Sequence, residues 1–204
     1  MKALDDPDAP DSTPLTPEDV EGLIPTWVAT RAELNECEQE NIESAIRWAF
    51  SRRGYRAMSE VEALLTSAFS DRLHQRMFGD VWRWAGVRRK RETNIGVAPG
   101  DIAVEMKLAF DDVRYWHGQA TYERSEIAVR LHHRLVKIHP YPNGNGRQTR
   151  LIADLYLHLS DGRPLSWGGG IHLGETGPDR ARYIDALRVA DDGDMSALLA
   201  FATA

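Results

Sequence analysis

Apolar residues recur every three or four positions along most of the chain, which is the period of an α-helix with one buried face. After Thr30, a good N-cap residue, Leu34, Ile42 and Ala45 fall on roughly one helical face. Polar or glycine-containing breaks separate such stretches. The pattern predicts helices that begin at Thr16, Thr30 and Ser59, and further helices over 101–116, 125–138, 147–159, 178–190 and 195–203.

This periodicity fails between residues 84 and 97. Gly86, Gly96 and the polar pair Thr93-Asn94 are typical of turns, so we expect an exposed β-hairpin here. Four consecutive basic residues, 88–91, lie in the same segment, and we expect them to form a solvated hairpin surface. The expected fold class is therefore all-α, a helical bundle with one small β-hairpin.

Residues 1–16 contain three prolines and several aspartates but little that is apolar, so we expect a flexible, acidic, proline-rich tail. The whole chain of 204 residues is 42% hydrophobic, which is enough for a buried core. We expect residues 17–204 to form a single domain.

Charge and cysteine content restrict the function classes. The net charge is −6, so we expect no direct binding to nucleic acid. Cys37 is the only cysteine in the sequence, which excludes an intramolecular disulfide and a cysteine-based metal site. No stretch approaches the roughly 18 apolar residues of a membrane span, and the acidic start does not resemble a signal peptide. These features predict a cytoplasmic protein without membrane contact.

Candidate chemistry is concentrated in the segment His139-Pro-Tyr-Pro-Asn-Gly-Asn-Gly-Arg-Gln-Thr-Arg150. Gly144 and Gly146 permit backbone conformations that turn successive N–H groups toward one point. The helix that follows adds N–H donors and the positive end of its dipole. Arg147 and Arg150 lie on one face of that helix, where both can reach a polyanion. The segment therefore predicts a di- or triphosphate site.

His139 lies at the other end of this loop. A neutral imidazole near a bound phosphate can take a proton from an incoming hydroxyl. Because a helix C-terminus favours the protonated form, we expect the rate to fall below about pH 6–7. Asn143 offers an oxygen that can bind a Mg²⁺ ion bridging two phosphates. The combination predicts phosphoryl or nucleotidyl transfer.

The single features of this segment are weak signals, and their combination is a strong one. A Gly-x-Gly loop or a histidine before proline is commonly structural when it occurs alone. The P-loop motif Gly-x-x-x-x-Gly-Lys-Ser/Thr is absent from the sequence. His132-His133 lacks zinc-ligand spacing and is expected to pack in the core.

These residues resemble the motif of Fic-domain proteins (the Fic/Doc, or Fido, family), His-Pro-Phe-x-(Asp/Glu/Asn)-Gly-Asn-Gly-Arg-x-x-Arg, with Tyr141 in place of Phe. The segment Val81-Trp-Arg-Trp-Ala-Gly86 and the basic residues after it resemble the family's flap hairpin, which pairs with an extended segment of the target protein. The closing stretch Arg182-Tyr-Ile-Asp-Ala-Leu187 through Phe201 is also similar to the family. Together with Ile24-Pro25 and Trp167-Gly-Gly, it resembles the bacterial subgroup called mobile mystery protein B.

The resemblance implies a protein adenylyltransferase that moves AMP from ATP to a Tyr, Ser or Thr hydroxyl of a target protein. It implies His139 as general base and Asn143 as ligand of a Mg²⁺ cofactor. The implied phosphate-binding residues are Gly144, Asn145, Gly146, Arg147 and Arg150, and the implied flap residues that position the target are Arg88, Arg89, Asn94, Ile95 and Gly96.

Many relatives carry an inhibitory helix whose glutamate pairs with the second arginine of the motif. Glu21, followed by Gly22 and placed 118 residues before His139, is the preferred candidate, on a short helix near 17–23. Glu40, followed by Asn41, is the second candidate and fits an ordinary solvent-facing position better.

Two alternatives stay open at this point. The protein is an enzyme that uses another nucleotide, or it is a toxin-like or regulatory module that binds nucleotide without transferring it. The subgroup also suggests a mobile bacterial element of toxin–antitoxin type, with a small DNA-binding partner protein, and a homodimer is a further possibility. The identity of the target is not encoded in any recognisable feature.

Overall fold

The computed structural model describes residues 4, 15–168 and 177–204. All regular elements in this part of the chain are helices, and an isolated antiparallel bridge joins Leu23 to Trp82. The predicted helical class is confirmed. None of the described helices is long and apolar enough to cross a membrane.

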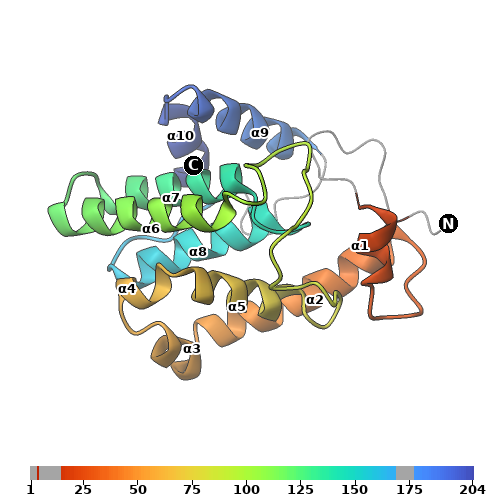
Figure 1. The fold of residues 1–204 in the computed structure, drawn as a ribbon. Coiled ribbons are helices and arrows are strands. Elements are labelled where there is room, and N and C mark those ends of the chain that lie inside the picture. Colours follow the sequence, from red (N-terminus) through yellow and green to blue (C-terminus); the bar gives the residue numbers. More distant parts are fainter. Residues whose placement is uncertain (1–3, 5–14, 169–176) are drawn as a thin grey trace.

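The described helices form a layered bundle (Figure 1). Their bounds are α1 Pro17–Glu21, α2 Arg31–Ala49, α3 Arg52–Ala57, α4 Val61–Leu64, α5 Ser67–Phe78, α6 Ile102–Gln119, α7 Arg124–Ile138, α8 Asn145–Leu159, α9 Pro178–Asp191 and α10 Ser196–Thr203.

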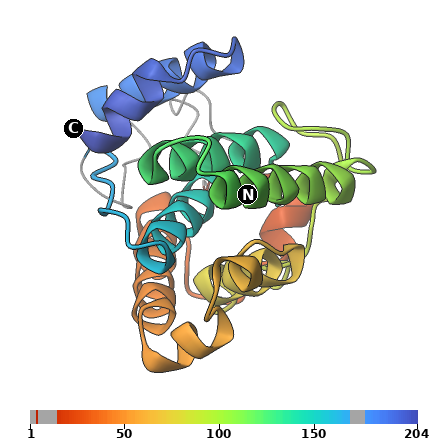
Figure 2. The same ribbon diagram turned by 90° about the vertical axis from the view of Figure 1, so that its left-hand side faces the viewer.

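Helices α7 and α8 occupy the centre and pack along each other. Figure 2 shows the α9–α10 pair on one side of them and the layer that contains α2 and α5 on the other. Most apolar side chains of α7 and α8, including Leu131, Leu135 and Leu155, are fully buried. The short connection between α7 and α8 is therefore held from both sides by packed helices.

Local sequence explains where the helices begin. The hydroxyls of Thr16 and Thr30 each accept a hydrogen bond from the backbone N–H of the third helical residue, and their own backbone N–H donates to the carboxylate of that residue, which forms a capping box. The helix predicted from Ser59 is instead two helices, α4 and α5. Its interruption follows from Thr66, which caps α5 by accepting from the Phe69 amide and so begins a new helix there.

The predicted hairpin over 84–97 is wrong in its hydrogen bonding. The segment reverses direction as an irregular loop, and its residues form no strand ladder with one another. Two of its backbone amides bond to residues outside the segment: Arg89 N donates to Pro140 O at 2.9 Å, and Val97 N donates to Ile138 O at 3.3 Å. We call residues 84–97 the flap loop. It runs between α5 and α6, past the α7–α8 connection.

Of the predicted tail, the structure describes Leu4, Leu15 and Thr16. Leu4 and Leu15 are buried, and the Leu4 carbonyl accepts from Arg31 Nη1 at 3.0 Å. These two residues therefore have apolar contacts that composition did not indicate. Residues 1–3 and 5–14 lie outside the described residues, so the boundary at residue 16 stays a prediction.

Candidate active site

The connection between α7 and α8 is built on two left-handed backbone conformations. His139 follows the last residue of α7 with φ 53° and ψ 61°, and Gly144 precedes α8 with φ 79° and ψ 0°. A residue other than glycine rarely adopts the left-handed conformation, and such strain concentrates at functional sites. The chain thereby passes from one helix into the next within six residues, with His139 at one end of the connection and Gly144 at the other.

The start of α8 has the geometry of an anion site. A Cβ on Gly144 would lie 2.5 Å from the ring of Phe78, so only glycine fits there. A Cβ on Gly146 would meet only ordinary contacts, 3.6 Å from Arg150 Nη1 and from Tyr183 Oη. The first-turn amides of α8 have no partner within the helix, so they are donors available to an anion.

The side chain of Asn145 has a different role from the one its motif position suggested. Its Oδ1 accepts from Tyr141 N at 2.9 Å, and its Nδ2 donates to Tyr141 O at 2.8 Å. This buried pair of bonds closes the loop, so Asn145 can contribute to phosphate binding through its backbone amide only.

His139 is neutral at physiological pH. Its side chain is buried, and its backbone oxygen accepts from Arg89 Nε at 2.7 Å. Burial, followed by the nearby charge of Arg89, lowers the pKa of His139 from 6.5 to about 4. These two effects outweigh the dipole of α7, which favours the protonated ring. A neutral imidazole is what a general base requires.

Arg150 carries the buried positive charge of the site. It is 1% exposed, and its Cζ lies 5.4 Å from the centre of the Tyr183 ring. Burial is the main cause that lowers the Arg150 pKa, and the charges of Arg180 and Arg147 add to this effect. The Arg150 guanidinium lies beside Gly146, where a polyphosphate would be attracted, and the charges of Arg180 and Arg147 are near enough to Arg150 to affect its pKa.

Asn143 presents its amide oxygen to the start of α8. Asn143 Oδ1 accepts from Gly144 N at 2.5 Å, and Arg147 Nη2 lies at 3.4 Å from the same oxygen. The backbone oxygen of Asn143 accepts from His74 Nε2 at 3.0 Å. The oxygen that was predicted to bind a metal therefore faces the predicted phosphate site.

The two arginines assigned to the flap point into the protein. Arg88 pairs with Asp71 through Nε (3.1 Å) and Nη2 (2.8 Å), and this hydrogen bonding raises the Arg88 pKa. Arg89 is buried and donates to the backbone oxygens of residues 91, 97, 138 and 139. Their guanidiniums hold the flap loop in place. The prediction of a solvated basic surface is wrong for the buried Arg89, whereas Arg88 is paired with Asp71 but stays partly exposed.

Gly96 brings the flap loop against His139. A Cβ on Gly96 would lie 2.8 Å from His139 Cβ and 2.6 Å from Arg89 Nη2, and its φ is 109°. Asn94 and Ile95, just before it, are exposed. Only these two flap residues of the predicted set offer side chains to a partner, and they do so beside the candidate base.

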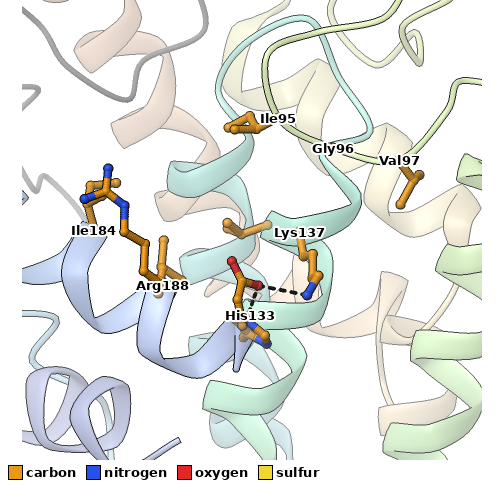
Figure 3. Close-up of a pocket in the computed structure, with 10 residues that line it drawn as sticks. Ile95, Gly96, Val97, His133, Lys137, Ile184 and Arg188 are labelled. Carbon is orange, nitrogen blue, oxygen red and sulfur yellow. Dashed lines mark hydrogen bonds and ion pairs between the residues drawn. The ribbon is translucent and has the colours of Figure 1, made fainter. Parts of the chain in front are cut away.

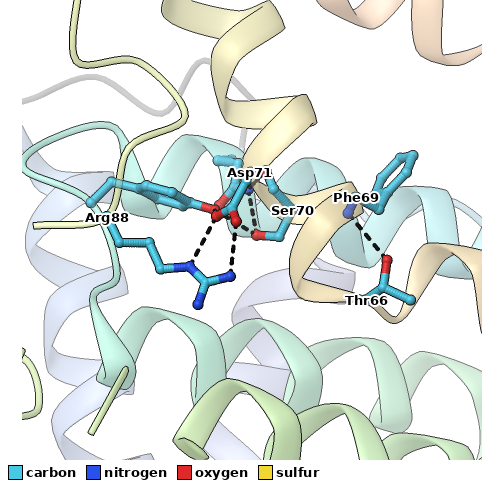
Figure 4. A network of polar contacts seen from close by, with 7 residues as sticks. Thr66, Phe69, Ser70, Asp71 and Arg88 are labelled. Carbon is cyan, nitrogen blue, oxygen red and sulfur yellow. Dashed lines mark hydrogen bonds and ion pairs between the residues drawn. The ribbon is translucent and has the colours of Figure 1, made fainter. Parts of the chain in front are cut away.

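Sequence reasoning missed a polar network beneath the loop (Figure 4). Tyr141 Oη donates to Asp71 Oδ1 at 2.8 Å and lies 2.9 Å from Ser70 Oγ. Gln148 Nε2 donates to the Ser70 oxygens at 2.9 Å. The hydroxyl that distinguishes Tyr141 from the usual Phe is thus used to bind α5. The tyrosine at this packing position was the one sequence feature that could have indicated a buried hydrogen-bond partner.

His74 was also missed. It is fully buried, accepts from Gly86 N through Nδ1 at 2.9 Å, and stacks on Tyr141 with ring centres 3.9 Å apart. Burial lowers its pKa to about 3, so the ring is neutral and its Nε2 is free to donate to Asn143 O. His74 therefore links the flap loop to the loop that carries the motif.

A cavity of about 340 Å³ lies between the flap loop, α7 and α9 (Figure 3). Its walls are mainly apolar and include Ile95, Val97 and Ile184. At one side, Asp191 Oδ1 accepts from Lys137 Nζ at 3.0 Å and lies 3.1 Å from His133 Nε2. Gly96 lines the cavity and also contacts His139, so the cavity adjoins the candidate base.

Neither predicted inhibitory glutamate contacts the motif arginines. The side chains of Glu21 and Glu40 are exposed, and no ion pair joins either carboxylate to a described residue. Glu21 takes part in the structure through its backbone oxygen, which accepts from Arg83 Nη1 at 3.1 Å. The acid that does reach the motif is Glu38, whose Oε2 lies 2.6 Å from Arg147 Nη1.

Comparisons with known proteins agree with this geometry. Residues 64–157 match the family model described as Fic/DOC family. The chain is 28% identical over 134 residues to "Protein adenylyltransferase Fic" of Drosophila willistoni, over 63% of this chain and 25% of that protein. The corresponding protein of Aedes aegypti gives the same identity and coverage. The chain thus spans about a quarter of the length of these relatives.

Solved structures share the fold. Fic-1 (aa134–508) from C. elegans has a TM-score of 0.66 at 22% identity, over 89% of this chain and 51% of that one. The BepC protein from Bartonella tribocorum, solved with bound AMPPNP, has a TM-score of 0.66 at 14% identity, over 91% of this chain and 96% of that one. At such identities the likeness establishes the architecture.

Proposed function

We propose, from the premise that residues 64–157 of this chain form a Fic/DOC family domain, that the protein is a protein adenylyltransferase. It transfers AMP from ATP to a Tyr, Ser or Thr hydroxyl of a target protein and releases pyrophosphate. The observation that carries the proposal is a neutral, buried His139 placed within six residues of a glycine-initiated helix start. The relatives named protein adenylyltransferase Fic support the same chemistry.

The triphosphate binds at the start of α8. The amides of Asn145 and Gly146 and the buried guanidinium of Arg150 provide donors and positive charge there, while the Gly144 amide donates to Asn143 Oδ1 and shapes the loop. The position that a Cβ on Gly146 would take lies 3.6 Å from Arg150 Nη1, so the backbone of Gly146 lets a phosphate oxygen approach this guanidinium. The arrangement offsets the negative charge that grows on the leaving pyrophosphate.

The base of the nucleotide occupies the cavity between the flap loop and α9. Its apolar walls suit a planar ring, and Asp191, Lys137 and His133 supply polar groups at one side. Gly96 lies between this cavity and His139. A nucleotide with its adenine ring in the cavity and its phosphates at the start of α8 therefore passes His139, the candidate general base. Its α-phosphate then lies near the imidazole.

Transfer requires one proton to move. The target hydroxyl oxygen attacks the α-phosphorus, the bond to the bridging oxygen of pyrophosphate breaks, and His139 accepts the hydroxyl proton. The exposed Asn94 and Ile95 bind the target segment beside this point. Arg88 and Arg89 act by holding the flap loop.

Magnesium fits the site through a single protein oxygen. Asn143 Oδ1 would hold the ion together with phosphate oxygens and water, a pattern that Mg²⁺ commonly adopts. The ion would neutralise phosphate charge and orient the triphosphate. Because an amide oxygen binds a cation less strongly than a carboxylate, the phosphates of the nucleotide would supply most of the ion's affinity.

ATP labelled in either the α- or the γ-phosphate tests the proposal. Wild-type protein incubated with Mg²⁺ and a bacterial lysate should gain protein-bound label from the α-labelled nucleotide only. His139→Ala should bind ATP but incorporate no label. Label from the γ-phosphate would indicate a kinase, and binding without any label would indicate a regulatory module.

A subgroup, a source and a partner are also proposed from the sequence resemblance. Ile24-Pro25, Trp167 and the flap sequence support membership of the subgroup called mobile mystery protein B, with a bacterial source, a toxin–antitoxin-like role and a small DNA-binding partner. Co-purification with a partner protein encoded beside this chain tests that assignment. Cytoplasmic location, a homodimer and inhibition by Glu21 also stay predictions.

A further inference from the structure

Glu38 is a buried carboxylate with both oxygens engaged. It lies on α2, and its side chain is 3% exposed. Its Oε1 accepts from Trp82 Nε1 at 2.6 Å, and its Oε2 accepts from Arg147 Nη1 at 2.6 Å. A buried charge is costly unless it is paired and hydrogen-bonded, as this one is. The pair joins α2 to the first arginine of the motif.

Arg147 continues this connection to the loop. Its Nη2 lies 3.4 Å from Asn143 Oδ1, and its guanidinium stands over the Phe78 ring at 5.0 Å. The same oxygen of Asn143 accepts from Gly144 N at 2.5 Å. An amide side chain can present either its oxygen or its nitrogen, and two donors on one side select the oxygen.

We propose that Glu38 is a positioning residue that acts through Arg147 to hold the Asn143 amide oxygen toward the start of α8. The inference rests on the proposed function, because that oxygen is the proposed ligand of the magnesium that accompanies ATP. On this proposal the two motif arginines have different roles. Arg147, with Nη1 on Glu38 and Nη2 near Asn143, orients the loop, whereas Arg150 binds phosphate.

The geometry also fixes the sign of the expected effect. If Glu38 instead restrained Arg147 from binding phosphate, removing its charge would strengthen ATP binding. If Glu38 orients the metal ligand, removing its charge weakens the contribution of Mg²⁺ and leaves metal-free binding of ATP nearly unchanged. Outer residues that orient metal ligands typically change metal affinity by about 10–100-fold.

Calorimetric titration with ATP, in Mg²⁺ and in EDTA, measures this contribution as the ratio of the two dissociation constants. Glu38→Gln keeps the volume of the side chain and removes its charge. We expect the ratio to fall about tenfold in Glu38→Gln. Glu40→Gln, an exposed position on the same helix, is the matched control and should keep the wild-type ratio.

A double-mutant cycle separates positioning from a general structural effect. Asn143→Ala should lower the ratio by itself, and Glu38→Gln should lower it no further in that background. Thermal melts of each variant check folding. If Glu38→Gln does not fold, Arg147→Lys replaces it, because a lysine ammonium cannot bridge Glu38 and Asn143 and should reduce the ratio similarly.

Several outcomes overturn the proposal. These are an unchanged ratio in folded Glu38→Gln, an additive loss in the double variant, stronger ATP binding by Glu38→Gln, or a wild-type ratio near one. Failure of the proposed function gives a different result. In that case the wild-type protein binds ATP with a magnesium-dependent ratio but incorporates no label from the α-phosphate.

Discussion

At the residue scale, the protonation state of His139 decides how the site works. A histidine at a helix C-terminus is expected to be more basic than usual, but here burial and Arg89 lower its pKa to about 4. The base is therefore neutral over the whole physiological range. The fraction of His139 in the neutral form therefore does not limit the rate near neutral pH.

This pKa predicts the acid limb of the pH–rate profile. Protonation removes the base, so activity is lost as pH falls through the folded-state value. The rate of AMP transfer should stay level between pH 8 and 6 and should decline only as pH approaches about 4. A steady-state profile measures this, with circular dichroism at each pH to confirm folding. A half-maximal rate near pH 6.5 would show an ordinary histidine.

Two glycines of the motif should respond differently to alanine. Gly144→Ala forces a side chain into φ 79° and against Phe78, so it should lower the melting temperature by several degrees. Gly146→Ala meets only ordinary contacts, so it should keep the melting temperature but weaken ATP binding about tenfold or more, because its methyl group lies beside Arg150. Thermal melts and calorimetry measure both. Equal behaviour of the two variants would contradict the geometry.

The motif residues were predictable, but several of their partners were not. Glycines before a helix and the two arginines indicate an anion site by type and spacing alone. Glu38, His74 and Asp71 come from helices far away in sequence, and nothing in their local pattern marks them. Matching a family pattern singled out Glu21 and Glu40 and not Glu38, although position 38 shares the buried face of α2 with Leu34 and Ile42.

At the element scale, the flap loop owes its shape to neighbours that it meets only in the folded chain. The sequence between 84 and 97 has the glycines and polar residues of a hairpin. Instead, the amides of Arg89 and Val97 donate to carbonyl oxygens at the end of α7 and just after it, and the buried Arg89 side chain donates to the backbone oxygen of His139. Long-range partners therefore replaced the local pairing that the pattern predicts.

Helix α1 secures the other side of this loop. Asp19 accepts from Arg91 through its side chain and from Trp84 Nε1 through its backbone oxygen at 3.1 Å. Trp84 in turn stacks on Trp82, with ring centres 4.9 Å apart. The flap loop is thus fixed between α1 and His139.

Weakening this contact should loosen the loop without unfolding the core. Arg91→Ala removes the ion pair with Asp19 but leaves the cap of α1 intact. Amide hydrogen exchange over residues 87–97 should become at least severalfold faster, while α7 and α8 keep their protection. Lys90→Ala is the neighbouring control. Unchanged exchange in Arg91→Ala would show that α1 does not secure the loop.

At the scale of the whole molecule, buried neutral histidines make stability depend on pH. Burial lowers the pKa of His74 to about 3 and of His139 to about 4, and that of His132 well below 6.5. Below pH 6.5 the unfolded chain binds protons that the folded protein excludes, so each group favours unfolding as pH falls. Asp154, whose pKa burial raises to about 7, acts in the opposite direction between pH 7 and 4.

The free energy of unfolding should therefore decrease from pH 6.5 toward pH 4. A histidine that is neutral when folded and protonated when unfolded contributes a slope of at most about 1.4 kcal/mol per pH unit, and Asp154 offsets one such group. Urea unfolding at half-unit steps of pH measures the slope. His132→Gln, if folded, should reduce it. Constant stability over this range would mean that these histidines are protonated in the folded protein.

The packing of the whole bundle also explains why one short segment can carry the chemistry. Layers on both sides bury the α7–α8 connection, which permits a strained His139 and a buried Arg150. Periodicity predicted these helices and their order. Their arrangement around the connection depends on contacts between distant segments, which periodicity does not encode.

The central claim is that the start of α8 and His139 together hold a triphosphate at its α-phosphorus. A crystal structure with Mg²⁺ and a non-hydrolysable ATP analogue tests this most directly. We predict phosphates on the amides of residues 145–147, the nucleotide's adenine ring between the flap loop and α9, and the His139 ring facing the α-phosphate. A nucleotide bound elsewhere, or a His139 ring turned away from that phosphate, would contradict the account.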